Sequence, residues 1–391
     1  MSRKLYADRM DLLGGESAFE VLARAKALED QGKHVVHFEI GEPDFNTPKN
    51  IVEAAKKALD ENYTHYSPSQ GYLPLREAIA EYVKKYKNVD ASPDEVVVVP
   101  GGKPVMYYTF MALVNAGDEV IYPNPGFPIY ESLIHFLQAV PVPVNIKEEN
   151  DFRLDVNELK SKITSRTKLI ILNSPANPTG GVLTPEDINS IADAVKGKGI
   201  YVLSDEIYER IVYSGNVKSI ASIPGMKDWT IILDGFSKTY AMTGWRLGYS
   251  ITNKELAQQF TSLMTNSNSC VATFTQIAGI EALTGPQDAV SEMVAEFKKR
   301  RDIIVNGLNS IRGISCKKPE GAFYAFPNIT GTGMSSKEIA DFLLNNAGVA
   351  TLSGESFGSC GEGYLRLSYA NSIDNIELAL ERIEKALKAV R

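Results

Sequence analysis

The sequence predicts an α/β protein with a large domain built on a mostly parallel sheet and a second, smaller α+β domain. The first reason is length, because 391 residues are too many for one ordinary hydrophobic core. The second is a series of short apolar runs that do not alternate with polar residues and are bounded by Pro, Gly or polar residues. The third is that helical patterns separate several of these runs. Continuous apolar strands separated by helices are typical of a parallel sheet covered on both faces.

Residues 1–46 are too few to form a domain, and we expect this N-terminal segment to pack with the small domain. Residues 47–288 are the predicted large domain. Helical patterns at 103–114 and 184–197 lie between its strands, and the first of these helices ends at the turn-forming sequence NAGD. The expected strands are 95–100, 118–123, 168–173, 200–206, 230–235 and 247–251.

Residues 289–391 are the predicted small C-terminal domain. The domain begins with one long amphipathic helix, 289–311. Short strands are expected at 321–327 and 364–370, flanked by helices in the sequences SSKEIADFLLNNAG and SIDNIELALERIEKALKAV. Helices and short strands mixed in this way predict an α+β unit.

The composition excludes several classes of protein. A net charge of −7 argues against a nucleic-acid or anionic-membrane surface. The three cysteines are scattered, without a CxxC or Cys/His cluster, so we expect neither a disulfide framework nor a metal site. No run reaches about 18 consecutive apolar residues, the length of a membrane span, and the N-terminus has no apolar signal core. A cytoplasmic protein is therefore expected.

Residues suited to ligand binding follow the predicted strands of the large domain, where ligands bind in open α/β sheets. Gly102 and Lys103 join strand 95–100 to a helix, whose N-terminus is a ready anion site, although glycines also serve plain turns. Phe127 lies on a proline-stiffened turn, where it is either a hydrophobic plug or a plate for a flat ring. Asn177 precedes a proline and offers its amide from a loop, although Asn and Pro also favour turns.

The next two strand ends carry charged residues. Asp205 directly follows buried apolar residues, so its carboxylate needs a partner or caps a helix. Tyr208 lies near Asp205 if the chain turns helical there. Ser237, Lys238 and Arg246 then stand in the otherwise small and apolar sequence DGFSKTYAMTGWRLGY, which suits a lysine that does covalent chemistry beside an anion.

Pyridoxal 5′-phosphate (PLP) requires this whole set of groups. Its aldehyde needs a lysine amine, and its ring nitrogen needs a carboxylate to stay protonated, so that the ring accepts electrons. Its phenolic oxygen needs hydrogen-bond donors. Its phosphate needs N–H groups, a hydroxyl and an arginine. We therefore interpret Lys238 as the lysine that bonds to the cofactor, with Ser237 and Arg246 holding the phosphate beside it.

Over essentially its whole length the sequence resembles the class I (fold-type I) PLP-dependent aminotransferases of the aspartate aminotransferase family. The matching motifs, in the order of that family, are GEPDF, YSPSQGYLPLREAIA, GGK, PNPGFPIY, NSPANPTG, SDEIYE, SKTYAMTGWRLGY and GYLRLSYA. The lysine segment is specific by itself, whereas each of the others is weak alone.

The resemblance implies a role for each matching residue. For the cofactor, it implies a covalent bond to Lys238, Asp205 at the ring nitrogen, Tyr208 and Asn177 as donors to the ring oxygen, and stacking by Phe127. It also implies phosphate binding by Ser237, Arg246 and the backbone N–H groups of Gly102 and Lys103. For the substrate α-carboxylate, it implies Arg366 with a backbone contact from Gly41 and Asn177 nearby. Tyr66 matches a tyrosine that reaches the phosphate in the neighbouring subunit's site, which implies a homodimer with shared sites.

Arg366 also stands out on physical grounds. It lies centrally in the apolar strand pattern YLRLSY, where a buried and unpaired guanidinium would be costly. Arginine suits a planar carboxylate through two parallel hydrogen bonds, whereas the alternative is a structural salt bridge.

The implied activity is transfer of the amino group of an L-amino acid, either aspartate-like or aromatic or aliphatic, to a 2-oxo acid such as 2-oxoglutarate. A PLP-dependent lyase on the same fold, of the C–S lyase or aminocyclopropane-carboxylate synthase type, is the main alternative. A PLP-binding transcription regulator would need a DNA-binding domain, for which the 40 residues before Gly41 are too few. No motif identifies a second cation for a dicarboxylate. The aromatic residues that could line a tolerant side-chain pocket are Phe19, Tyr63, Phe323 and Phe357.

Overall fold

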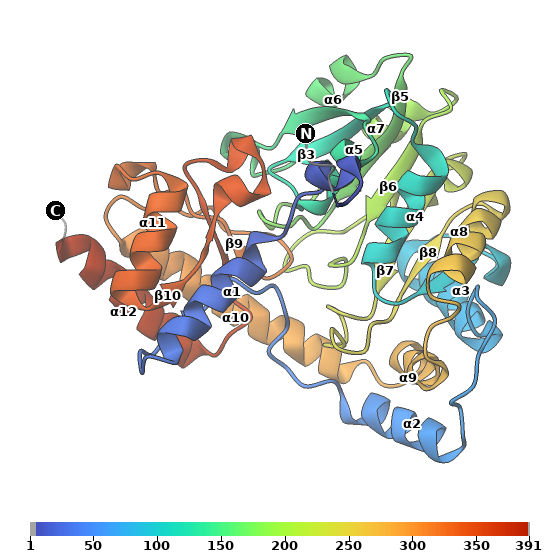
Figure 1. Cartoon of the computed structure of the whole chain (residues 1–391), viewed down its shortest axis with the longest axis horizontal. Helices are drawn as coiled ribbons and strands as arrows, with labels where there is room; N and C mark the ends of the chain where they lie inside the picture. Colours follow the sequence, from blue (N-terminus) through green and yellow to red (C-terminus); the bar gives the residue numbers. More distant parts are fainter. Residues whose placement is uncertain (1–4, 390–391) are drawn as a thin grey trace.

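The computed structural model describes residues 5–389 and contains a seven-stranded central sheet (Figure 1). The strand order is β2-β8-β7-β6-β5-β3-β4. The strands are β2 (Val96–Val99), β3 (Glu119–Asn124), β4 (Val140–Asn145), β5 (Thr167–Asn173), β6 (Tyr201–Asp205), β7 (Thr230–Gly235) and β8 (Gly248–Ile251). Within this sheet only β8 runs against the others, because it pairs antiparallel with both β2 and β7. The prediction of an α/β fold with a mostly parallel sheet is confirmed.

Strand β4 was not expected from the sequence. It carries Pro141 and Pro143, and it lies at the edge of the sheet, paired with β3 alone. Proline cannot donate to a ladder, so it is confined to such edges and makes a strand hard to recognise.

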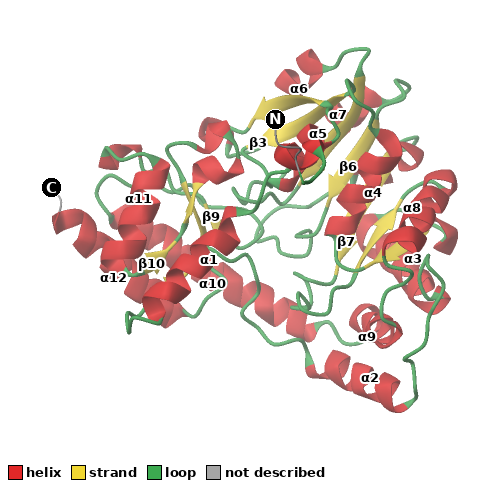
Figure 2. Ribbon diagram, viewed as in Figure 1, coloured by secondary structure: helices red, strands yellow, loops and turns green. Residues whose placement is uncertain are grey.

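Helices pack around the central sheet (Figure 2). They are α3 (Leu73–Lys87), α4 (Lys103–Leu113), α5 (Ile129–Phe136), α6 (Val156–Lys162), α7 (Pro185–Val195), α8 (Lys254–Ser267) and α9 (Thr273–Thr284). Helix α2 (Lys49–Asp60) lies farther from the sheet and packs against α9. Helix α7 begins at a capping box in which the Thr184 hydroxyl accepts from the Asp187 N–H and the Asp187 carboxylate accepts from the Thr184 N–H. Helix α4 begins directly after Gly102, at the end of β2.

A second group of elements lies beside the large sheet, with the long helix α10 (Asp288–Ser310) running between the two (Figure 1). This second group contains a three-stranded antiparallel sheet with the order β11-β12-β9. The elements are β9 (Tyr324–Ala325), α11 (Ser336–Phe342), a π-helical turn (Leu343–Ala347), β10 (Val349–Ala350), β11 (Leu352–Ser353), β12 (Leu365–Ser368) and α12 (Ile373–Ala389).

The N-terminal segment contacts both groups. Helix α1 (Ser17–Glu29) packs near β10 and β11, and β1 (Val36–His37) pairs parallel with β10. Before α1, a 3-10 helix (Asp8–Leu12) contacts α5, and the Gly14 N–H donates to the Ser132 hydroxyl. The remaining 3-10 helices are Pro93–Glu95, Glu148–Asn150, Ile220–Ser222, Lys227–Trp229, Thr330–Thr332, Gly354–Phe357 and Ser359–Gly361. Between residues 5 and 389, no helix is long and apolar enough to cross a membrane.

Candidate active site

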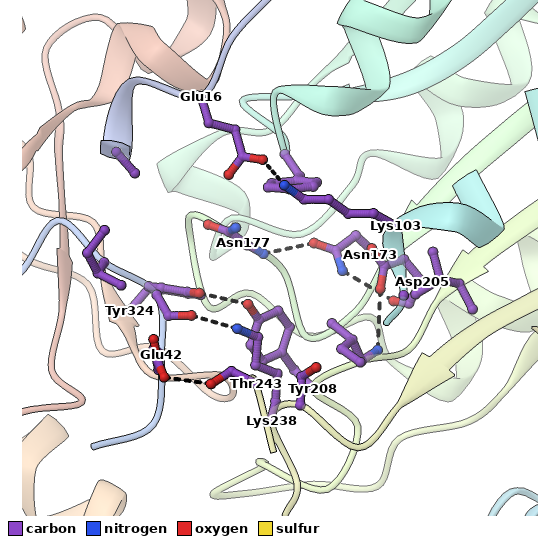
Figure 3. Close-up of a pocket in the computed structure, with 18 of the residues that line it drawn as sticks. Glu16, Glu42, Lys103, Asn173, Asn177, Asp205, Tyr208, Lys238, Thr243 and Tyr324 are labelled. Atoms are coloured by element: carbon purple, nitrogen blue, oxygen red, sulfur yellow. Dashed lines mark hydrogen bonds and ion pairs between the residues drawn. The ribbon is translucent and has the colours of Figure 1, made fainter. Parts of the chain in front are cut away.

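A cavity of about 360 Å³ is lined by residues of the central sheet's loops, the N-terminal segment and the short C-terminal sheet (Figure 3). This volume is in the range of small-molecule sites. All of the predicted site residues except Tyr66 lie on its lining. They are Gly41, Gly102, Lys103, Phe127, Asn177, Asp205, Tyr208, Ser237, Lys238, Arg246 and Arg366. The parallel strands thus bring their carboxyl-terminal loops to one place.

Lys238 follows β7 and is half-buried in this cavity. Its Nζ donates to the backbone oxygen of Gly41 at 2.6 Å. Burial lowers the pKa of Lys238 to about 8, and the positive charges of Arg366 and Arg246 act in the same direction, against the attraction of Glu42. A fraction of this amine is therefore neutral at physiological pH, as a nucleophile or a base requires.

Asp205, at the end of β6, is the buried carboxylate of the cavity. The Tyr130 hydroxyl of α5 donates to its Oδ2 at 2.5 Å, and the Ile207 N–H donates to its Oδ1 at 3.3 Å. Burial raises the pKa of Asp205 to about 6 in spite of these two hydrogen bonds. The carboxylate is therefore largely ionised at neutral pH and would be stabilised by a positive ring nitrogen in the cavity.

Asn177 is buried, and its side-chain oxygen has no hydrogen-bond partner in the part of the chain that the structure describes. Its backbone N–H donates to the Asn173 side-chain oxygen at 2.8 Å, and the Asn173 amide donates to the Asp205 backbone oxygen at 3.2 Å. Asn173 thus ties the ends of β5 and β6 together. An unpaired buried amide oxygen is costly, so it points to a ligand group that completes it.

An anion site is suggested by residues from three segments. Gly102 and Lys103 lie at the start of α4, Ser237 is buried after β7, and Arg246 lies on the cavity lining with its Nη1 donating to the Thr243 backbone oxygen at 2.7 Å. Gly101 makes room for the arginine, because a Cβ there would lie 2.1 Å from the Arg246 guanidinium. A helix N-terminus, a hydroxyl and a guanidinium suit a phosphate.

Arg366, on β12, is 4% exposed. Its Nη2 donates to the backbone oxygen of Glu39, while its Nε has no hydrogen-bond partner among residues 5–389. Its guanidinium lies 4.7 Å from the Tyr324 ring centre and 5.3 Å from that of Phe357. A buried guanidinium that is flanked by rings and keeps a free donor can receive a carboxylate.

Tyr66 is the predicted site residue that the single chain does not bring to the cavity. Its side chain is 90% exposed. Five further residues line the cavity or hydrogen-bond to a lining residue, although the sequence analysis gave them no role in the site. They are Glu16, Glu42, Tyr130, Asn173 and Tyr324. Tyr130 ends the sequence PNPGFPIY and Asn173 begins NSPANPTG, so both could have been found at the borders of recognised motifs.

The expected aromatic pocket is only partly present. Phe19 lines the cavity, and the Phe357 ring centre lies 5.3 Å from the guanidinium of Arg366, which is on the lining. Phe323 is instead buried in the core of the C-terminal elements, with its ring centre 5.9 Å from Lys238 Nζ. Tyr63 packs edge-on against Tyr72 and does not line the cavity.

Comparison with known proteins agrees with this geometry. Residues 33–383 match the family model described as aminotransferase class I and II. The chain belongs to this family. The predicted resemblance, and with it the fold-type I architecture, is confirmed.

The individual relatives include proteins named as aspartate aminotransferases and proteins named as aromatic-amino-acid aminotransferases. An aspartate aminotransferase of Pyrococcus horikoshii is 44% identical, with 98% of this chain and 97% of that protein covered. The aromatic-amino-acid aminotransferase 2 of Thermococcus litoralis is 40% identical, with 98% of each chain covered. The solved structure of the Thermus thermophilus aspartate aminotransferase with maleate is 34% identical and has a TM-score of 0.93, covering 98% of this chain and 100% of that chain. The family and these relatives support amino-group transfer by a PLP-dependent transaminase, and the lyase alternative is not favoured.

Proposed function

We propose that this chain transfers the amino group of an L-amino acid to a 2-oxo acid, with 2-oxoglutarate as acceptor, using PLP held in the cavity around Lys238. The observation that carries the proposal is a lysine of lowered pKa in one cavity with a buried carboxylate, Asp205, and a buried guanidinium, Arg366. These three groups match the needs of the cofactor's aldehyde, the cofactor's ring nitrogen and the substrate's carboxylate.

The residues present fit the cofactor. Among residues 5–389, the Arg366 Nε is a buried donor without a partner, which a substrate carboxylate would complete, and the Asn177 oxygen is a buried acceptor that a donor on the ligand would complete. Asp205 is ready to pair with a protonated ring nitrogen. In this proposal Lys238 holds the cofactor covalently, Phe127 stacks on the ring, and the Tyr208 hydroxyl and the Asn177 amide N–H₂ donate to the ring oxygen. The phosphate is held by Ser237, Arg246 and the backbone N–H groups of Gly102 and Lys103. When bound, PLP supplies an electron-accepting ring that stabilises the negative charge left after deprotonation of the substrate α-carbon.

The chain's own residues do the rest of the chemistry. Arg366 binds the α-carboxylate of the amino acid and fixes the α-carbon within reach of Lys238. The amino group of the substrate displaces Lys238 from the cofactor, and the freed lysine is then a neutral amine. It takes the α-proton and later gives a proton back, acting first as base and then as acid. Its pKa of about 8 is suited to both tasks near neutral pH.

The side-chain pocket contains one more cation, the Lys103 ammonium, which is ion-paired with Glu16 at the start of α1. We infer that an acidic substrate draws Lys103 away from Glu16, whereas a neutral substrate leaves the pair intact. This exchange would allow both aspartate-like and aromatic donors. It is consistent with relatives named for aspartate and for aromatic amino acids, and with a relative whose structure contains the dicarboxylate maleate.

A panel of L-amino acids assayed against 2-oxoglutarate tests the proposal through kcat/KM. We expect transfer with aspartate and with at least one aromatic donor. No transfer from any donor, or release of ammonia in place of glutamate, would contradict it.

We further propose that the active form is a homodimer in which Tyr66 reaches the partner's site. The test is to refold Lys238→Ala and Tyr66→Ala chains together. Each mixed dimer then has one intact site, and because random pairing makes half of the dimers mixed, activity should recover towards about a quarter of wild type. Chains that exchange but regain no activity would exclude the shared site. Assays of the Tyr66→Ala homodimer at limiting PLP would show its defect most clearly, since one lost hydroxyl contact is worth only about 1–3 kcal/mol.

A further inference from the structure

Two tyrosine hydroxyls meet inside the cavity, and they come from different sheets. Tyr208 follows β6 of the central sheet, whereas Tyr324 begins β9 of the short C-terminal sheet. Their oxygens lie 2.7 Å apart, and both side chains line the cavity (Figure 3). This is a full-strength O–H···O distance between residues 116 positions apart in the sequence.

The position of Tyr324 is fixed on several sides. The residue is 1% exposed, and its ring packs edge-on against the Tyr208 ring with centres 5.7 Å apart. The Arg366 guanidinium also lies against this ring, 4.7 Å from its centre. The Tyr324 hydroxyl also occupies the space beside Gly41, where an added Cβ would lie 2.2 Å from it. Gly41 in turn accepts the Lys238 hydrogen bond, so Tyr324 contacts each of the proposed substrate- and cofactor-binding regions.

The hydrogen bond between the two hydroxyls leaves one phenolic proton available to a ligand in the cavity. Burial raises the pKa of both phenols, so the pair holds two protons at neutral pH. One hydroxyl proton forms the hydrogen bond between the two oxygens, and the other can be donated to a ligand in the cavity. If Tyr324 donates to Tyr208, the proton of Tyr208 remains available for a ligand acceptor, and its O–H is polarised by the hydrogen bond that it accepts.

We infer that Tyr324 is a positioning residue of the active site: its hydroxyl donates to Tyr208 and thereby directs the Tyr208 proton to the ring oxygen of the cofactor, while its ring supports the Arg366 guanidinium. The inference rests on the proposed function, because it assumes PLP beside Tyr208. It adds a residue that none of the recognised motifs contains. Tyr324 would connect the arginine that binds the substrate with the tyrosine that binds the cofactor.

Tyr324→Phe tests the role, because it removes the hydroxyl and keeps the ring. The bound cofactor's absorbance should be titrated with pH in the holoenzyme. A weaker Tyr208 donor stabilises a charged ring oxygen less, so we expect the midpoint of the titration to rise by about 0.5–1 pH unit, as the loss of one neutral hydrogen bond would give. kcat/KM should fall by roughly threefold to tenfold for every donor.

The matched control is Tyr369→Phe. Tyr369 is fully buried in the same part of the chain, and its hydroxyl contacts the Tyr213 hydroxyl and the Ala322 oxygen, each at 3.2 Å, outside the cavity lining. This variant loses a comparable buried hydroxyl and should leave the titration midpoint unchanged. The charged groups near the hydroxyl pair are the same in both variants: Arg366 on β12, Asp205 on β6, Lys238 after β7 and Glu16 at the start of α1.

A double-variant comparison completes the test. Because Tyr324 acts through Tyr208, the variant lacking both hydroxyls should titrate like Tyr208→Phe alone. Independent, additive shifts would overturn the inference, and so would a Tyr324→Phe midpoint equal to that of the Tyr369→Phe control. Failure of the proposed function has a different signature, since the wild-type protein would then bind no PLP chromophore and transfer no amino group.

Discussion

Replacing Lys87 with methionine should destabilise the protein by about 3–5 kcal/mol at pH 8, the usual result of leaving buried charges without their partner. Lys87 ends α3, and its side chain is 0% exposed. Its Nζ lies 2.8 Å from carboxylate oxygens of Glu206, Glu209 and Asp234. Although burial alone would lower it, attraction by these carboxylates raises the pKa of Lys87 well above its usual value, so the ammonium stays charged.

The magnitude follows from the charges that remain. At an effective dielectric constant of about 20, each contact of this length contributes an attraction of roughly 6 kcal/mol, set against the desolvation of each ion and the mutual repulsion of the carboxylates. Methionine removes the attraction and leaves the repulsion. Two members of the cluster are close in sequence to proposed site residues, because Glu206 directly follows Asp205, and Asp234 comes three residues before Ser237.

The defect should depend on pH in a defined direction. In the wild-type protein, burial raises the pKa of Glu209 to about 7 and also raises that of Asp234. A carboxyl group with a raised pKa in the folded state contributes stability below its unfolded pKa, and that contribution is lost as the pH rises through the folded pKa. Without Lys87 the pKa of Glu209 rises further, so the difference between the variant and the wild type should grow from pH 5 to pH 8.

Thermal unfolding followed by circular dichroism measures the effect, which should be a fall in midpoint of roughly 5 °C at pH 8. Lys84→Met is the matched control, because Lys84 lies on the same helix and pairs with Asp90 at 3.0 Å on the exposed surface. Exposed pairs contribute little, so the control midpoint should barely change. Equal midpoints for the two variants, or a defect of Lys87→Met that does not grow with pH, would refute the reasoning.

Three further predictions concern Arg366 in the site and two residues of the N-terminal segment, Glu16 and His37. Arg366→Lys should lower kcat/KM for all donors by on the order of 10²-fold, since the bidentate carboxylate contact is common to every substrate; a loss confined to acidic donors would contradict this. Glu16→Gln should raise the kcat/KM ratio of aspartate to phenylalanine by roughly threefold by freeing Lys103, and an unchanged ratio would exclude the competition. The Nδ1 of His37 lies 2.7 Å from Glu39 Oε1, and its Nε2 lies 3.1 Å from Glu29 Oε1. The hydrogen bond to Glu39 in particular raises the pKa of His37 to about 9. Its stabilisation should therefore be complete below pH 6.5 and lost as the pH rises through 9, and His37→Gln should remove this part of the pH dependence of the unfolding midpoint.

Much of the site could be predicted from the sequence because its residues follow buried strands. Asp205 ends β6, and Asn177 and Lys238 follow β5 and β7. Parallel neighbours in a sheet bring such strand ends and loops to the same edge. The apolar runs revealed these strands, and the polar residues after them were therefore recognisable as candidates. The same logic failed for β4, whose prolines disguise an edge strand.

The contacts that could not be predicted from the sequence depend on packing between segments far apart in the chain. Tyr324 meets Tyr208 across 116 positions, and Lys87 meets Asp234 across 147, so no local pattern marks either contact. Glu16 is similar, because its ion pair with Lys103 depends on where α1 packs, and its surrounding sequence resembles any solvated helix start. Tyr66 shows the reverse: the sequence resemblance assigns it a role that needs a second chain.

The central claim is that Lys238 forms the covalent bond to the cofactor, and borohydride reduction followed by peptide mapping tests it most directly. The reagent fixes PLP permanently on the amine to which it is bonded. We expect the label on the peptide that contains Lys238, and we expect Lys238→Ala to fold but to lose both the label and turnover. A reduced adduct on another lysine, such as Lys254, with no label on Lys238, would contradict the account.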